Sequence, residues 1–442
     1  MGSITGRPDS PRRRSHLTVA VVAAVLATAL TACSSTNSSG TPAPSSKTGT
    51  SSTSAIPSSA FNDHTGITST SVSVGNVSTL SGGLFKGAVV GSQAYADYVN
   101  AQGGVNWRKI VVDSTDDQYA GAPNKQETQS AIEHDFAMVG SFSTFDNFGG
   151  TVLAANPQVP NVTVSLDLAT NNLPNTFSPS PAANGWQLGP LAYFQKKYPT
   201  AITHTAAMVA GVPSAISKWN AEKSAMESLG YKVVYDPTFQ ISQSDFNQNV
   251  VVMKNDGVKI LFLEQMPQNY AAAVVKALNQ QDFHPVLVLG GSTYSEELVP
   301  NAGGASAIDG SYMEQNTSLF LGEDSSSLPA IGTFQTWVQK ASPGFKADLY
   351  TLFGWLSTEL FAQGLQAAGT DPSRGSELKA LRSITSFSGG NLVGTANPSG
   401  KVPTNCFIIA KIVSGRYQRL DDPPPSGSAH GYRCDQPYFY AK

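Results

Sequence analysis

Short apolar runs alternate with helix-like stretches along most of the chain beyond residue 70. The apolar runs, rich in Val, Ile, Leu and Phe, lie at residues 72–77, 110–112, 136–139, 159–164, 206–209, 233–235, 260–263 and 286–289. Between them, segments such as 88–99, 219–229 and 270–278 carry apolar residues at helical spacing. Short, fully apolar strands separated by helices are typical of a parallel sheet covered on both faces. The pattern predicts an α/β fold.

Length and charge limit the architecture and the partners. The chain has 442 residues, with 28 Lys and Arg against 31 Asp and Glu. The stretch from residue 71 onward exceeds what one hydrophobic core usually serves, so we expect two domains. A nucleic-acid partner would require a basic face, and the slight acidic excess argues against one.

The first 32 residues have the pattern of an export signal. Arg12, Arg13 and Arg14 precede an uncharged apolar run over residues 17–32, which is shorter than the ~20 residues of a spanning helix. The run ends in Leu-Thr-Ala before Cys33 and resembles a bacterial lipobox. That resemblance implies a lipid on Cys33 and a place on the outer face of the cell membrane. The alternatives are a plain signal peptide or a membrane anchor with a chance cysteine.

Two further features concern the mature chain. Residues 33–70 are mostly Ser, Thr, Gly and Pro and predict a flexible tether. With Cys33 lipidated, Cys406 and Cys434 remain, and an even pair outside the cell suggests one disulfide. A metal or redox role would need more ligands or a close CxxC spacing, so no metal site is predicted.

The Gly103-Gly104 pair raises the question of a phosphate cradle. A cradle requires a strand, then the glycines, then a helix N-terminus. Here a helix-like stretch ends at Asn100 and a strand follows the glycines. The order predicts a helix cap and connector instead.

The same region carries a family resemblance. Residues 77–118 resemble the start of extracytoplasmic solute-binding proteins of the branched-chain amino-acid receptor type, a periplasmic binding protein fold of type I. Four elements occur in order and with matching spacing: Leu80-Ser81-Gly82, Asn-Ala-x-Gly-Gly at 100–104, Arg108-Lys109-Ile110, and Asp116-Asp117. The resemblance continues through residues 139–141 and 174–178 to about residue 420.

The resemblance implies a clamp of two doubly wound parallel-sheet lobes joined by three crossing segments. We expect crossings near residues 177–181, 310–316 and 397–404. Lobe 1 would comprise residues 71–178 and 317–400, and lobe 2 residues 179–316 and 401–442. Loops at the carboxyl ends of the strands would then enclose a small solute, with no cofactor. The partner implied is an ABC permease; the alternative is a sensor that signals through the same clamp.

Matches to the family's cleft loops supply the candidate ligand-binding residues. They are Phe85, Ser143, Thr144, Ser165, Asp167, Ser214, Gln265 and Ser292, with Tyr350 added as a stacking candidate beside Tyr294. Some have a structural alternative: Ser143 or Thr144 can cap the helix that follows, and the aromatic residues can be core packing.

Ser292 bears on the solute. It occupies the place where receptors for amino acids carry a carboxylate for the ligand's ammonium, and an unpaired ammonium in a closed cleft is costly. A standard α-amino acid is therefore expected only if Glu264 or Asp167 substitutes. An amide, a sugar or an aromatic acid remains open.

The sequence motifs give little support to an enzyme. The six histidines form no HExxH pair, and GxSxG, Walker and GxGxxG motifs are absent from the sequence. Ser376 and Lys379 fit SxxK, but the KTG at residues 47–49 precedes it, which is the wrong order for a penicillin-recognising acylase. The aspartates at 113, 116 and 117 lack the spacing of a calcium loop. A cell-wall hydrolase is thus a third hypothesis, behind the receptor and the sensor.

Overall fold

Two large β-sheets organise the chain. The computed structural model describes residues 55–420 and 431–441. The first sheet is parallel, in the order β2-β1-β3-β4-β5. Its strands are β1 (Ser71–Ser78), β2 (Lys109–Asp116), β3 (Ala137–Val139), β4 (Asn161–Val162) and β5 (Thr176–Phe177). The predicted α/β class with parallel sheets is confirmed.

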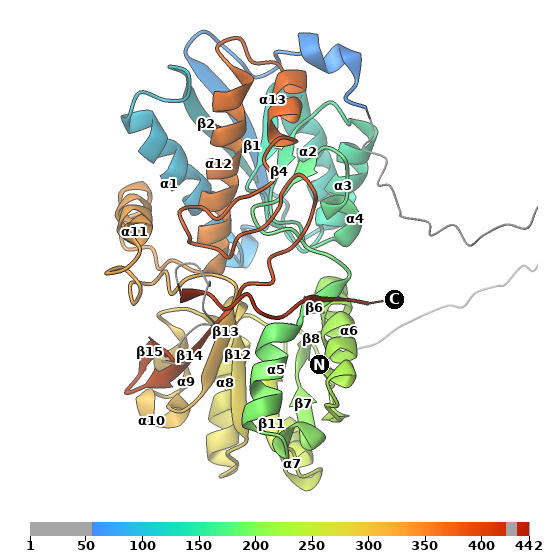
Figure 1. Cartoon of the computed structure of the whole chain (residues 1–442), viewed down its shortest axis with the longest axis vertical. Coiled ribbons are helices and arrows are strands. Elements are labelled where there is room, and N and C mark those ends of the chain that lie inside the picture. The colour runs from blue at the N-terminus through green and yellow to red at the C-terminus, as the bar shows by residue number, and fades with distance from the viewer. Residues whose placement is uncertain (1–54, 421–430, 442) are drawn as a thin grey trace, which may run out of the picture. The chain divides into compact units, whose positions relative to one another are not determined.

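Helices cover both faces of the first sheet (Figure 1). Successive side chains of β1 point to opposite faces, so Val74 packs in the cluster that contains α1 and α12, whereas Val77 packs in the cluster that contains α2 and α3. The helices are α1 (Lys86–Ala101), α2 (Gly121–His134), α3 (Asp146–Ala155), α4 (Leu168–Asn171), α11 (Pro329–Ala341), α12 (Leu349–Ala368) and α13 (Arg374–Leu381).

Two glycines allow α1 and α12 to lie close together. A Cβ on Gly91 would stand 1.9 Å from the Thr351 carbonyl oxygen, and a Cβ on Gly354 would stand 2.1 Å from the Ala88 carbonyl oxygen. Real Cβ atoms do not approach backbone atoms so closely. The pair therefore sets how the helix from the far part of the chain docks on the first helix.

The second sheet has the order β15-β14-β13-β12-β11-β7-β9. Its strands are β7 (Thr205–Ala207), β9 (Val233–Tyr235), β11 (Ile260–Leu263), β12 (Val286–Gly290), β13 (Tyr312–Gln315), β14 (Ile408–Val413) and β15 (Arg416–Arg419). The first five of these run parallel, and β14 and β15 form an antiparallel hairpin at one edge. The predicted strands stopped at residue 289, so the hairpin was not anticipated.

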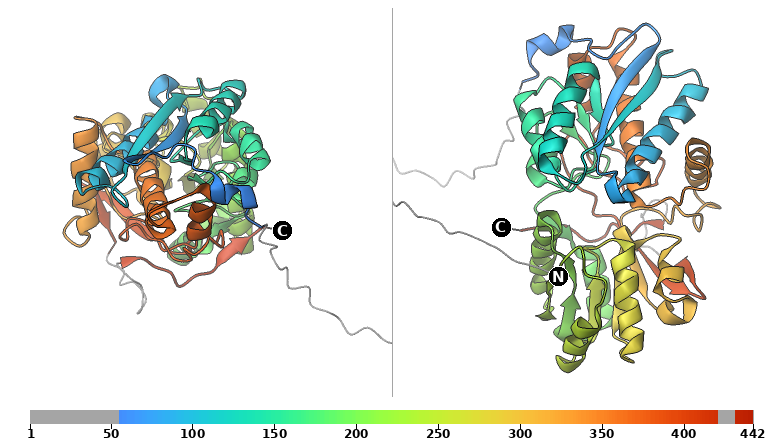
Figure 2. Two further views of the ribbon diagram at one scale, coloured as in Figure 1. Left: turned by 90° about the horizontal axis from the view of Figure 1, so that it is seen from above. Right: turned by 180° about the vertical axis from the view of Figure 1, so that it is seen from behind.

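Helices also cover both faces of the second sheet (Figure 2). Side chains of α5 and α6 share a cluster with Phe262 and Val288, and those of α7 and α8 share a cluster with Leu261 and Leu289. The helices are α5 (Leu188–Lys197), α6 (Pro213–Ser228), α7 (Asn247–Asn255), α8 (Gln268–Gln280), α9 (Leu298–Ala302) and α10 (Ala305–Ile308). Two short ladders pair β6 (Gly185–Gln187) with β16 (Tyr438–Tyr440) and β8 (Val209–Ala210) with β10 (Thr238–Phe239).

The chain passes between the sheets three times. β5 belongs to the first sheet and β6 lies beside the second; β13 leads from the second sheet to α11 and α12, and residues 382–407 return to β14. This order supports the predicted lobes, 71–178 with 317–400 and 179–316 with 401–442, whose boundaries stay predictions.

Local details differ from the sequence pattern. The run predicted as a strand over residues 159–164 is a strand only at β4, flanked by Pro160, which lacks an N–H, and by Thr163, whose N–H still donates to the Phe177 carbonyl at 3.0 Å. The run at 206–209 divides into β7 and β8. Gly103 and Gly104 have φ of 105° and 80°, and the Gly104 N–H donates to the Val99 carbonyl (3.0 Å), which confirms the predicted cap.

The segment before β1 is packed, which corrects the predicted tether of residues 33–70 at its carboxyl end. A 3₁₀ helix, η1 (Ser58–Asn62), buries Ala60. Asp63 forms an ion pair with Arg374 of α13 at 2.9 Å. The Ser-rich composition did not indicate that this segment is ordered. One charge pair and a few apolar side chains are enough to order a segment so short. Residues 1–54, with the predicted signal and Cys33, lie outside the described residues.

No helix within the described ranges is long and apolar enough to cross a membrane.

Cys406 and Cys434 are joined by a disulfide, with a sequence separation of 28 residues. It links the chain before β14 to the segment that leads into β16, and Phe407 and Arg433 also exchange two backbone hydrogen bonds of 2.9 Å there. Most of the Pro-rich tail at residues 421–431 lies outside the described ranges.

Replacing both cysteines with serine is expected to lower the free energy of unfolding by about 3 kcal/mol, because a loop of this length then gains freedom in the unfolded chain. Urea denaturation of the purified protein measures the change. Reducing the wild type should bring its midpoint down to that of the double variant. Equal midpoints for oxidised wild type and variant would show that the bond contributes nothing.

Candidate functional site

A cavity of about 260 Å³ is lined by residues from both sheets' strand ends and from the crossing segments. Its polar lining includes Ser165 after β4, Glu264 and Gln265 after β11, Ser292 after β12, Glu314 on β13 and Lys218 on α6. Phe353 of α12 and Trp186 of β6 contribute apolar surface. Loops at the carboxyl ends of parallel strands are where this class of sheet binds ligands. We therefore take this cavity as the candidate solute site.

Three of the nine predicted ligand residues line the cavity. The Ser165 hydroxyl donates to Asp146 at 2.6 Å. The Gln265 amide donates to Glu222 at 2.9 Å. The Ser292 hydroxyl lies 2.7 Å from the Glu264 carbonyl oxygen, so it positions the loop after β11 as well as facing the cavity.

Three other predicted residues, on the loops of the first sheet, have structural partners or lie outside the cavity lining. The buried Ser143 hydroxyl donates to Asp117 and accepts the Phe145 N–H at 2.9 Å, just before α3. Asp167 caps α4 by accepting the Thr170 N–H at 2.8 Å. Thr144 is half-buried and does not line the cavity. Ser143 thus bonds within the turn ahead of α3 without capping that helix, whereas Asp167, for which no cap was predicted, is the N-cap of α4.

The predicted aromatic residues form a packed cluster. Phe85 is 3% exposed, and its ring centroid lies 4.8 Å from that of Phe142 and 4.7 Å from that of Tyr350. Tyr294 is buried and donates to Glu323 at 2.6 Å. Ser214 lies in the first turn of α6, one turn before Lys218, and is not part of the cavity lining. The structure therefore brings Ser165, Gln265 and Ser292 together and leaves the other six apart from them.

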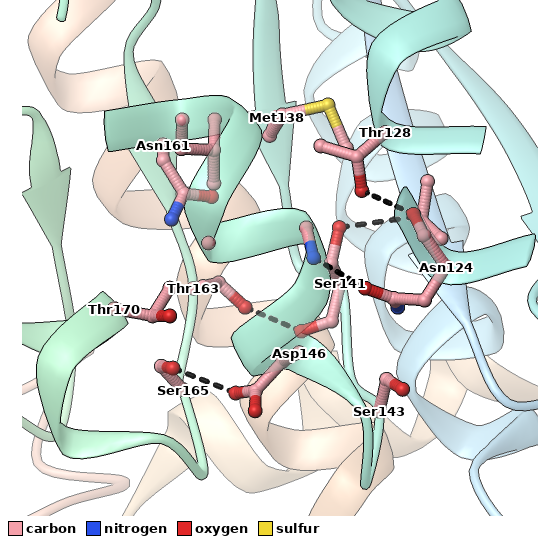
Figure 3. Close-up of a pocket in the computed structure, with 14 residues that line it drawn as sticks. Asn124, Thr128, Met138, Ser141, Ser143, Asp146, Asn161, Thr163, Ser165 and Thr170 are labelled. Carbon is pink, nitrogen blue, oxygen red and sulfur yellow. Dashed lines mark hydrogen bonds between the residues drawn. The ribbon is translucent and has the colours of Figure 1, made fainter. Parts of the chain in front are cut away.

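A second, smaller space of about 30 Å³ lies inside the first sheet's layer, between α2, α3 and β4. Figure 3 shows the residues that line it. It is far too small for a solute and corresponds to about one water. Asp146 lies at its edge and accepts the Ser165 hydroxyl and the backbone N–H of Leu166, both at 2.6 Å. This carboxylate fixes the loop after β4, which reaches the larger cavity.

The acidic pair after β2 is also structural. Asp116 accepts the Leu80 N–H at 2.9 Å, and the buried Asp117 accepts the Asn124 amide at 3.1 Å and the Thr79 hydroxyl at 3.1 Å. Within the described residues no group of three His, Cys, Asp or Glu side chains could hold a metal ion.

Three glutamates dominate the electrostatics of the cavity's second-sheet wall. Glu222 is fully buried, and Glu264 and Glu314 are each 7% exposed. Burial raises the pKa of Glu222 to about 8, and it also raises the pKa of Glu314. Burial, reinforced by the charges of Glu222 and Glu314, raises the pKa of Glu264 well above its usual value. At neutral pH the Glu222 carboxyl group therefore holds its proton when no cation is near.

The sequence offered only part of this cluster. Glu264 was anticipated as a possible substitute for the missing carboxylate at Ser292. Glu222 carried a signal that could have been used: it lies three residues after Trp219 and four before Met226, which places a carboxyl on the buried face of α6. Glu314 lies on a strand that the pattern did not reveal.

Two doubly wound sheets with a polar cavity at their strand ends define a clamp-like solute-binding protein. The model of the family described as "Periplasmic binding protein" matches residues 71–416, and the chain belongs to this family. The predicted membership in the periplasmic binding proteins is thus confirmed. Periplasmic binding proteins of ABC transporters are extracytoplasmic.

Solved structures share the fold. A solute-binding protein of an ABC transporter from R. palustris, in complex with 4-hydroxybenzoate, is 18% identical, with a TM-score of 0.67 over 83% of this chain and 98% of that one. A leucine-binding protein from Thermotoga maritima is 14% identical, with a TM-score of 0.66 over 79% and 97%. A branched-chain amino-acid binding protein from Streptococcus pneumoniae in complex with isoleucine is 15% identical, with a TM-score of 0.64 over 83% and 100%. A search of curated proteins finds no match.

Proposed function

We propose that the protein is a lipid-anchored extracytoplasmic receptor that captures a small polar solute and delivers it to an ABC-type permease. The observation that carries the proposal is the cavity of about 260 Å³ at the strand ends of both sheets, where polar side chains stand among apolar ones. Small-molecule sites are concave, with a few placed polar groups for orientation. The lipid on Cys33 and the permease are inferred from the lipobox and the family.

The size of the solute follows from that of the cavity. Neighbours of the same fold are in complex with 4-hydroxybenzoate and with isoleucine. A cavity of this volume suits a solute of similar size. Binding would draw on hydrogen bonds from the loops after β4, β11 and β12, and closure of the two lobes would exclude water from them.

A thermal-shift screen of the full-length chain, with its disulfide intact, tests the proposal. The library should span amino acids, amides, sugars, aromatic acids and amines. A solute at 100 times its dissociation constant is expected to add about 2.7 kcal/mol to stability. No shift with any class would contradict the proposed function.

The variant Ala183→Trp locates the binding. Ala183 lines the cavity and is half-buried, so an indole there should fill it and weaken binding at least about tenfold, a difference of about 1.4 kcal/mol. The neighbouring exposed Asn184→Trp is the matched control and should bind like the wild type. If both variants bind equally well, the solute site lies elsewhere.

A further inference from the structure

Three carboxyl groups from different parts of the chain converge on the cavity wall without a cation among them. Glu222 comes from α6, Glu264 follows β11 and Glu314 lies on β13. Glu264 and Glu314 line the cavity directly. Within the described residues, and apart from a proton shared between Glu264 and Glu314, no protein donor reaches either carboxyl oxygen of Glu264 or the Oε1 atom of Glu222. Buried polar groups of folded proteins are almost always satisfied, so orphan oxygens at the wall of an open cavity call for a partner that enters that cavity.

The groups packed around the cluster do not supply that partner. Gln265 donates to the Oε2 atom of Glu222, and the Tyr231 hydroxyl donates to the Leu191 carbonyl (2.6 Å) instead of to a glutamate. Lys218 also lines the cavity, on α6. Its electrostatic partner is the carboxylate of Asp146 and not one of the three glutamates. The carboxyl groups of Glu264 and Glu314 lie within hydrogen-bonding reach of each other, so one of them holds a proton.

We propose that Glu222, Glu264 and Glu314 form a subsite for a cationic nitrogen group of the solute, an ammonium or a guanidinium. The inference rests on the proposed function and narrows its solute class. Such a group brings several N–H donors and a positive charge, which together satisfy the orphan oxygens and offset the repulsion between the carboxylates. The subsite therefore favours amines and guanidino compounds. A solute with only anionic groups would be repelled by the carboxylates.

Binding at this subsite is coupled to proton release. In the free protein Glu222 holds its proton at neutral pH, whereas a bound cation favours the carboxylate form. Its affinity therefore rises with pH up to about pH 8, the native pKa of Glu222, by as much as about tenfold per pH unit for each proton released. A neutral solute shows no such dependence.

Calorimetric titration of the full-length protein tests the subsite. The probes are putrescine, agmatine and arginine, with butane-1,4-diol and glutarate as uncharged and anionic counterparts. At least one cationic probe should bind, the counterparts should not, and the heat should differ between two buffers of unequal ionisation enthalpy, which reports the released proton. Glu264→Gln and Glu314→Gln should each weaken binding at least about tenfold.

Glu377→Gln is the matched control. Glu377 is also a buried glutamate whose carboxyl oxygens lack a partner in the described chain, but it lies on α13 beside Gly364 of α12 and does not line the cavity. It should bind the probe like the wild type. Thermal unfolding of each Gln variant checks that the fold is intact.

The outcomes separate this inference from the proposed function. If a sugar or an aromatic acid binds in the cavity and no cationic probe does, the subsite is overturned and the receptor function stands. If a cationic probe binds Glu264→Gln and Glu314→Gln as tightly as the wild type, or without releasing protons, the subsite is likewise overturned. If no solute of any class binds, both proposals fall.

Discussion

Replacing Arg374 with methionine is expected to lower the free energy of unfolding by about 3–5 kcal/mol. The guanidinium is 4% exposed and donates to the carbonyl oxygens of Ile132 (2.7 Å), Asp135 (2.6 Å) and Phe136 (3.0 Å). It also pairs with Asp63 at 2.9 Å. Methionine fills part of the space but leaves three carbonyl groups and a carboxylate without their donor.

The change should also release the segment before β1. Asp63 and the Arg374 backbone N–H, which donates to the Asp63 carbonyl at 2.9 Å, hold this segment against α13. Hydrogen exchange of residues 55–70 should therefore rise in the variant more than exchange in the second sheet. Urea denaturation gives the stability change.

Arg416→Met on β15 is the control, because that side chain is exposed, and it should shift stability by less than about 0.5 kcal/mol. Arg374→Lys keeps the charge but loses the planar fork and should fall between the two. If Arg374→Met is as stable as Arg416→Met, the ion pair and its carbonyl contacts do not hold the segment.

The parts of the fold that could be predicted were those fixed by local pattern. The apolar runs around β1, β3, β11 and β12 are buried on both faces, so they read as strands without knowledge of their neighbours. Gly104 could be assigned to a cap because a helix end needs a left-handed residue there whatever the tertiary structure. The order of residues 55–70 could not be predicted, because it depends on Arg374, about three hundred residues away in sequence.

The candidate site was less accessible for two physical reasons. Serine and aspartate at the start of a helix serve equally well as caps and as ligand contacts, so Ser143 and Asp167 could not be separated from Ser165 by sequence. The carboxyl cluster depends on sheet order: β11 and β13 flank β12, and α6 packs near their ends. Residues 222, 264 and 314 meet only through that topology.

The carboxyl cluster should make the unliganded protein less stable as pH rises. Each buried glutamate holds its proton in the folded state to a higher pH than in the unfolded chain. Between the unfolded pKa of about 4.5 and the native pKa of about 8 for Glu222, the folded state therefore binds more protons, and the free energy of unfolding falls as pH increases. The slope is about 1.4 kcal/mol per pH unit for each such group.

Glu222→Gln isolates this contribution. The variant cannot ionise, so it should match the wild type near pH 5 and exceed its free energy of unfolding near pH 8 by about 3 kcal/mol, measured by urea denaturation at each pH. Glu227→Gln on the same helix is the control, because its carboxylate is exposed, and its stability should follow the wild type at every pH.

If removing these carboxyl groups stabilises the ligand-free protein, the groups are kept for binding and not for folding. Burying them lowers the stability of the free protein, and a bound cation offsets that loss. The same titration with a saturating cationic probe should then abolish the slope between about pH 5 and pH 8, because the bound folded state and the unfolded chain both carry carboxylates there. If Glu222→Gln lowers stability at every pH instead, the carboxyl group serves the fold, and the cluster's acidity has no connection with the solute.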